Sequence, residues 1–156
     1  MTAKNIERFN EMAGKVLGHL YLNFPAPTSF DAETIGLPMG RKVHFLDSSG
    51  QAATIVDTGS VTVEEEFFGH TVRWLRDSGY LTFSGNYISA FASVVLTSKG
   101  LEVLNAVPES IKGGPSLGEQ LSDATKSGAA ELLRSVTSEA LALGTKVLSA
   151  GMGFPS

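Results

Sequence analysis

The chain has 156 residues, of which 42% are hydrophobic and 18% charged, and it contains no cysteine. This length suits one domain, or one domain with an appendage, and is enough to bury a core without covalent cross-links. The lack of cysteine excludes disulfides, thiolate nucleophiles and Cys-ligated metal sites. A net charge of −4, from 16 acidic and 12 basic residues, argues against an overall basic nucleic-acid binder and leaves only a local basic surface open.

Targeting signals are not evident in the sequence. The N-terminus lacks the apolar core of a signal peptide. No window approaches the ~18 consecutive apolar residues that a membrane-spanning helix requires. We therefore expect a cytoplasmic protein.

Residues 5–24 are predicted to form a first helix, because apolar side chains recur there at steps of three and four. Pro25 follows directly, and a proline disfavours helix in the residue before it. A second, short helix is expected to begin at Thr28, since Thr28 and Asp31 resemble a capping box, and to close before Pro38.

Residues 39–61 contain two strand-like runs, at 43–46 and 53–56. The sequence Asp-Ser-Ser-Gly at 47–50 separates them and is a strong turn signal. The segment is therefore predicted to be a β-hairpin.

A third helix is predicted at 62–78, with Thr62 as its cap. Glutamates occupy positions 64–66 in its first turn, where the helix macrodipole favours anions. Its inward stripe consists of three apolar residues, Phe68, Val72 and Leu75. Gly79 has the expected position and residue type to end the helix.

Two further strands are expected at 80–83 and 88–96, with a turn at 84–86 between them. Trp74, at the end of the third helix, is expected to pack inward near the first of these strands. Thr97 is predicted to cap another helix.

The order helix, short helix, helix, strand, turn, strand, helix describes a helix-turn-helix with a β-hairpin wing. Residues 70–81 (HTVRWLRDSGYL) and 95–104 (VLTSKGLEVL) carry a resemblance to the winged helix-turn-helix superfamily. They are similar to bacterial regulators of the MarR and PadR type, and the likeness covers about residues 5–107. One departure is the segment 39–61, which separates the second helix from the third.

The expected fold class is mainly α with small β: a winged helix-turn-helix with an inserted β-hairpin and a long C-terminal helix. A winged-helix domain is expected at 1–108, including the inserted hairpin at 39–61. Residues 109–116 are interpreted as a linker because they are rich in Gly, Pro and Ser. A long C-terminal helix is expected at 117–150.

The resemblance implies that the third helix would enter the DNA major groove through its N-terminal half. That half carries Glu64 to Glu66, which phosphates would repel, and the wing at 82–95 contains no Lys or Arg. If the chain binds duplex DNA, the candidate contacts are Arg73, Arg76, His70 and Lys99. The alternative is that the two arginines pair with acidic neighbours on a solvated face.

Catalysis is not indicated by the residues. The histidines His19, His44 and His70 lie on different elements without metal-ligand spacing, and His19 is interpreted as a structural residue beside an apolar face. No nucleophile elbow occurs, and the glycines at 113–114 lack the Lys of a phosphate loop. Consecutive glutamates on a helix do not face each other. We expect no enzyme and no cofactor.

The C-terminal helix is predicted to have an apolar stripe that it cannot bury alone. This stripe could pack against the chain's own domain, against a second copy of the chain or against a lipid surface. A membrane surface is unlikely on charge, because the polar side holds three basic and four acidic residues. A homodimer is favoured, since two-fold assembly is the commonest oligomer. Its predicted interface is Leu121, Gly128, Leu132, Val136, Leu143 and Val147.

From these observations we expect a non-catalytic winged-helix protein that acts as an oligomeric protein-interaction or assembly module. The alternative is a DNA-binding transcriptional regulator of the winged-helix type. The sequence names neither a protein partner nor an operator.

Overall fold

The computed structural model describes residues 3–37, 42–44, 54–56, 62–87, 89–108 and 113–152. Side chains are described in these ranges except at 42–44, 54–56, 87 and 147–152. Over the described residues the chain is mainly helical, with a four-stranded antiparallel sheet and a separate pair of strands.

The chain divides into two compact units. The helical unit combines Met1–Leu22 with Leu96–Ser156, and the sheet unit is Asn23–Val95. The predicted linker at 109–116 therefore lies inside the helical unit. The first helix belongs with the C-terminal helices, not with the residues that immediately follow it in sequence.

Helix α1, Lys4–Asn23, confirms the first predicted helix. Its apolar stripe is buried, including Ala13, Val16 and Leu17. Each fully buried aliphatic side chain of this size stabilises the fold by about 1.5–3 kcal/mol.

The predicted second helix is wrong over its first half. Residues Thr28–Asp31 form strand β1, and only Ala32–Ile35 are helical, as the single 3₁₀ turn η1. Asp31, not Thr28, is the cap, because its carboxylate accepts a hydrogen bond from the amide of Thr34 at 3.0 Å. The structure of residues 28–31 is therefore determined by strand pairing and not by the local capping signal, because β1 pairs antiparallel with a strand about sixty residues later in the chain.

The inserted hairpin is confirmed. Strand β2, Lys42–His44, pairs antiparallel with β3, Thr54–Val56, and Val43 lies opposite Ile55. The predicted turn at 47–50 lies outside the described residues.

The third predicted helix is α2, Val63–Asp77, and Gly79 follows it with a φ of 89°. The strands that follow α2 are β4 (Leu81–Thr82), β5 (Gly85–Tyr87) and β6 (Ala90–Leu96). The predicted turn at 84–86 is wrong, because β5 extends across 85–86 and pairs with β6.

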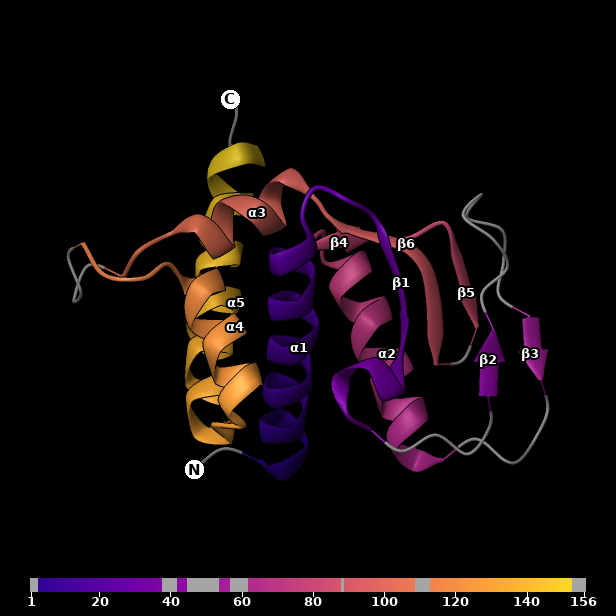
Figure 1. Cartoon of the computed structure of the whole chain (residues 1–156). Helices are drawn as coiled ribbons and strands as arrows, with labels where there is room; N and C mark the ends of the chain where they lie inside the picture. The colour runs from indigo at the N-terminus through magenta and orange to yellow at the C-terminus, as the bar shows by residue number, and fades with distance from the viewer. Residues whose placement is uncertain are drawn as a thin grey trace. The chain divides into compact units, whose positions relative to one another are not determined.

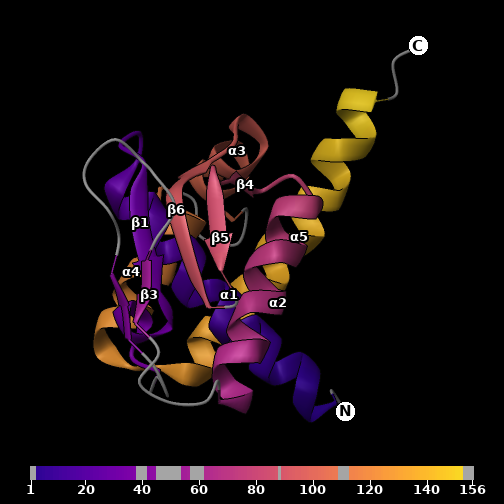
Figure 2. The same ribbon diagram turned by 90° about the vertical axis from the view of Figure 1, so that its right-hand side faces the viewer.

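The sheet has the order β1–β6–β4, with β5 also paired to β6. Phe30 on β1, Phe68 on α2 and Phe91 on β6 are fully buried against one another, with ring centroids 5.7–6.4 Å apart. Aromatic pairs at such separations add about 0.5–1.5 kcal/mol beyond the area they bury. This cluster holds α2 against the sheet. Figures 1 and 2 show the helix beside the strands.

Helix α3, Ser98–Asn105, begins after Thr97, whose hydroxyl accepts a hydrogen bond from the Gly100 amide as predicted for a cap. The expected single long C-terminal helix is wrong. The structure contains α4, Leu117–Ser127, and α5, Ala130–Met152. Gly128 separates them with a φ of 73°, a left-handed conformation that glycine adopts without steric cost.

Helices α1, α4 and α5 pack side by side in the helical unit, with α3 near one end (Figure 1). Small residues allow close approach: a Cβ on Gly18 would lie 3.2 Å from the backbone of Leu121. The hydroxyl of Ser122 donates to the Gly18 carbonyl at 3.3 Å. The α4–α5 hairpin therefore folds back onto α1 of the same chain.

Folding back changes the predicted oligomer interface. Leu121 and Val136 are buried within the chain itself, so they cannot form a partner-facing stripe. Gly128 forms the turn between two helices, and Leu143 is half-buried. Of the predicted set only Leu132 is a largely exposed apolar side chain, at 44%. The side chain of Val147 lies outside the described residues.

Candidate interaction surface

Helix α2 is fixed at its start by a reciprocal cap. The amide of Glu65 donates to Thr62 Oγ1 at 3.0 Å, and the amide of Thr62 donates to Glu65 Oε1 at 3.3 Å. The second carboxylate oxygen of Glu65 accepts a hydrogen bond from the Ser89 hydroxyl at 3.0 Å, and Glu65 is fully buried. The middle glutamate therefore anchors the helix, whereas Glu64 and Glu66 are exposed.

The solvent side of α2 forms one continuous face along the helix. We call it the α2 face: Val63, Glu66, Phe67, His70, Arg73, Trp74 and Asp77. These residues recur at steps of three and four, as positions on one side of a helix do. All are exposed or half-buried, and Val63 is 70% exposed. Exposed apolar side chains grouped on one surface commonly mark an interaction site.

The C-terminal half of α2 is basic. The Arg76 guanidinium lies 4.7 Å from the ring centroid of Phe83 and forms an ion pair with Asp77 at 2.8 Å. The Arg73 guanidinium lies 5.5 Å from the ring of Phe91. Burial, and secondly the charge of Arg76, lower the pKa of Arg73 from its usual value. Both arginines therefore lie against aromatic rings from the segment that follows α2, Phe91 and Phe83.

Trp74 is not the buried residue that the sequence suggests. It is 46% exposed and stacks on the buried ring of Tyr80, with centroids 6.4 Å apart and ring planes 18° apart. Trp74 follows Phe67 and His70 at steps of three and four, so the three residues share one side of the helix. The inward stripe of Phe68, Val72 and Leu75 lies on the opposite side, so the spacing alone indicates that Trp74 is exposed. Trp74 is thus a rigid aromatic surface residue with one ring face supported.

The four candidate DNA contacts do not all belong to one unit. Arg73, Arg76 and His70 lie on α2 of the sheet unit, and His70 is exposed as expected. Lys99 lies on α3 of the helical unit. The alternative interpretation holds for Arg76, which pairs with Asp77.

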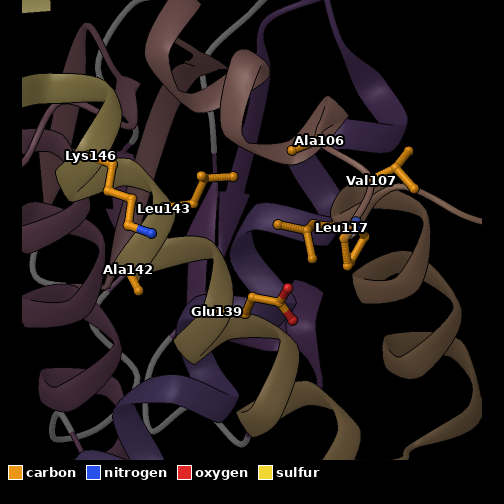
Figure 3. Close-up of a pocket in the computed structure, with 8 residues that line it drawn as sticks. Ala106, Val107, Leu117, Glu139, Ala142, Leu143 and Lys146 are labelled. Atoms are coloured by element: carbon orange, nitrogen blue, oxygen red, sulfur yellow. The ribbon is translucent and has the colours of Figure 1, made fainter. Parts of the chain in front are cut away.

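A second concave site lies in the helical unit. Residues of the segment after α3, including Val107, face α4 and α5 across a groove of about 600 Å³ (Figure 3). Leu117 and Leu143 supply apolar walls, and Glu139 and Lys146 supply opposite charges from the same helix.

Clusters of metal-ligating side chains are absent from the part of the chain that the structure describes. Within it, no three His, Asp or Glu side chains gather as a metal site would require. His19 is half-buried and burial lowers its pKa, which fits its interpretation as a structural residue. The side chain of His44 lies outside the described residues. Over the same ranges, no helix has the length and hydropathy to cross a membrane.

Comparison of the chain with family models, with curated proteins and with solved structures finds no match.

Proposed function

We propose that the chain is a non-catalytic winged-helix protein that acts as a protein-interaction and assembly module, with the α2 face as its contact surface. The winged-helix assignment is supported by the order of elements. Helix α1 and the turn η1 precede α2, and the paired strands β4 to β6 follow it as a wing. The short η1 and the inserted hairpin distinguish it from a compact helix-turn-helix.

The observation that carries this proposal is the chemistry of the exposed α2 residues. In a DNA-reading winged helix, the N-terminal half of this helix would approach the phosphates. Here that half exposes the carboxylates of Glu64 and Glu66, and phosphate neutralisation supplies much of the affinity for DNA. The exposed Val63 and Trp74 instead suit a protein contact, in which aromatic residues dominate the binding energy.

A DNA titration tests the proposal. Labelled duplexes are titrated with the full chain in about 100 mM salt, where charge contributions remain visible. We expect no binding below micromolar concentration. Sub-micromolar binding with a steep salt slope would overturn the proposal in favour of a regulator. Arg73 and Arg76 would then each account for about one unit of that slope.

A crosslinking experiment tests the contact surface directly. A photoreactive phenylalanine replaces Trp74 in the full chain, and the matched control carries it at Ser138, which is exposed on α5. We expect protein adducts from position 74 and few from 138. Equal yields from both positions would contradict the assignment of the surface.

A further inference from the structure

The α2 face has a symmetry that suggests what binds it. His70 lies at its centre, and the other positions are arranged almost equally on either side along the helix. Glu66 and Arg73 lie on one edge of the face, seven residues apart. Phe67 and Trp74 lie on the opposite edge, also seven residues apart. Seven residues are about two helical turns, so each pair keeps to its own edge.

An antiparallel copy of the same helix complements this pattern. A two-fold axis through His70, perpendicular to both helices, brings residues whose numbers add up to about 140 opposite one another. Glu66 of one copy then faces Arg73 of the second, and Phe67 faces Trp74. At the two ends Val63 faces Asp77, whose carboxylate keeps its ion pair with Arg76 of its own copy. Because the operation is symmetric, each contact occurs twice, as in any isologous interface.

We propose that the α2 face binds the α2 face of a second copy of this chain, as an antiparallel two-fold pair centred on His70. This inference rests on the proposed function and names its partner. The interface contains two Glu66–Arg73 ion pairs and two Phe67–Trp74 contacts. It moves the expected homodimer contact from the C-terminal helices, where Leu121 and Val136 are buried within the chain, to a surface that is exposed.

The charges favour a second copy over other partners. An acidic partner would suit Arg73 but be repelled by Glu66, and a basic partner would have the opposite problem. A copy of the same face places an opposite charge against both Glu66 and Arg73. The Arg73 guanidinium is already partly desolvated over the Phe91 ring, so an added carboxylate improves its surroundings. Antiparallel packing also aligns the two helix dipoles favourably.

Charge reversal with rescue tests the pairing. Sedimentation velocity on the full chain measures dimerisation up to about 200 µM, since a contact through one helix per copy is at the small end of interface sizes. Glu66→Arg and Arg73→Glu should each weaken the dimer by about tenfold or more. The double variant, which restores opposite charges across the axis, should return affinity to within about threefold of the parent.

Two matched controls separate pairing from folding effects. Glu64→Arg places the same charge change in the first turn of α2, so it has the same effect on the helix dipole, but Glu64 lies off the α2 face. Arg76→Glu is the corresponding control for Arg73. We expect both controls to dimerise like the parent, and circular dichroism to show all variants folded.

A single introduced cysteine provides a second measurement. The chain has no cysteine, so His70→Cys can cross-link only to itself in a second copy. Closely packed helix axes 8–10 Å apart bring facing Cα atoms within reach of a disulfide. Mild oxidation should yield covalent dimers from His70→Cys and almost none from Ser138→Cys.

Several results would overturn the inference. A strict monomer at every concentration would do so, as would a double variant as weak as the single ones. A dimer broken by Leu132→Asp but not by Glu66→Arg would place the contact on α5 instead. None of these results contradicts the proposed function. Only the DNA titration or the crosslinking at Trp74 can contradict it.

Discussion

The contact of Gly14 on α1 with Thr137 on α5 gives a sharp test of the helical unit. A methyl group added at Gly14 would collide with Thr137 Oγ1 and lie 3.2 Å from Leu133 Cδ2. Thr137 is fully buried, and its hydroxyl makes no hydrogen bond to the residues that the structure describes. Gly14→Ala should therefore destabilise the chain, and Thr137→Ala should make room for the added methyl.

The magnitudes follow from opposing contributions. Alanine in a helix interior is favoured over glycine by about 1 kcal/mol. Overpacking a closed core costs about 1–3 kcal/mol. We expect Gly14→Ala to lower the free energy of unfolding by about 1 kcal/mol. In the double variant Thr137→Ala removes the colliding hydroxyl, so the cycle should show a favourable coupling of about 1–2 kcal/mol.

Urea unfolding followed by circular dichroism measures all four proteins of this cycle. The chain's single tryptophan, Trp74, lies in the sheet unit, so its fluorescence shows whether both units unfold together. A Gly14→Ala protein about 1 kcal/mol more stable than the parent, as helix propensity alone predicts, would refute the close approach. A coupling below about 0.3 kcal/mol would show that Thr137 is not the obstacle.

Three further predictions concern single residues. Glu65→Ala should lower the free energy of unfolding in urea by about 2–3 kcal/mol, because it removes a cap and leaves the Ser89 hydroxyl without its acceptor. The control Glu66→Ala should lower it by less than about 0.5 kcal/mol, and equal losses would contradict the anchoring role of Glu65. Gly128→Ala should lower the free energy of unfolding by about 1 kcal/mol, since it forces a side chain into a left-handed conformation, and an unchanged Tm would argue against the turn. Burial lowers the pKa of His19, so the unfolded chain binds more protons than the folded chain below about pH 6.5, and the free energy of unfolding falls as the pH drops from there. His19→Gln should flatten that slope, and an identical slope would show that His19 is not its source.

Local signals in the sequence predict local structure well. The caps at Thr62 and Thr97 and the glycine at 79 are all confirmed, because each depends on atoms within a few residues. Strand β1 could not be predicted in the same way. Its hydrogen bonds go to β6, and at Thr28 nothing in the neighbouring sequence competes with the capping signal.

Gly128 shows a different limit of prediction from the sequence. A glycine within a helical periodicity fits either a close helix contact or a helix end, and the apolar stripe continues on both sides of it. Only the packing of α4 and α5 onto α1 decides between the two. The candidate surface is partly predictable. The sequence assigns Arg73 and His70 to it, and the spacing of Trp74 from the inward stripe indicates exposure as well, but the stacking of Trp74 on Tyr80 follows only from the fold.

The discontinuous helical unit affects the order in which the chain can fold during synthesis. Helix α1 is made about a hundred residues before α4 and α5, against which the side of α1 with Gly14 and Gly18 packs. The sheet unit, residues 23–95, is continuous and can complete itself first. At ribosomal rates of about 5–20 residues per second, this side of α1 waits for roughly 5–20 seconds without its packing partners. During that interval the nascent chain presents an amphipathic helix of the kind that chaperones bind, and a chain cut before α4 retains that exposure permanently.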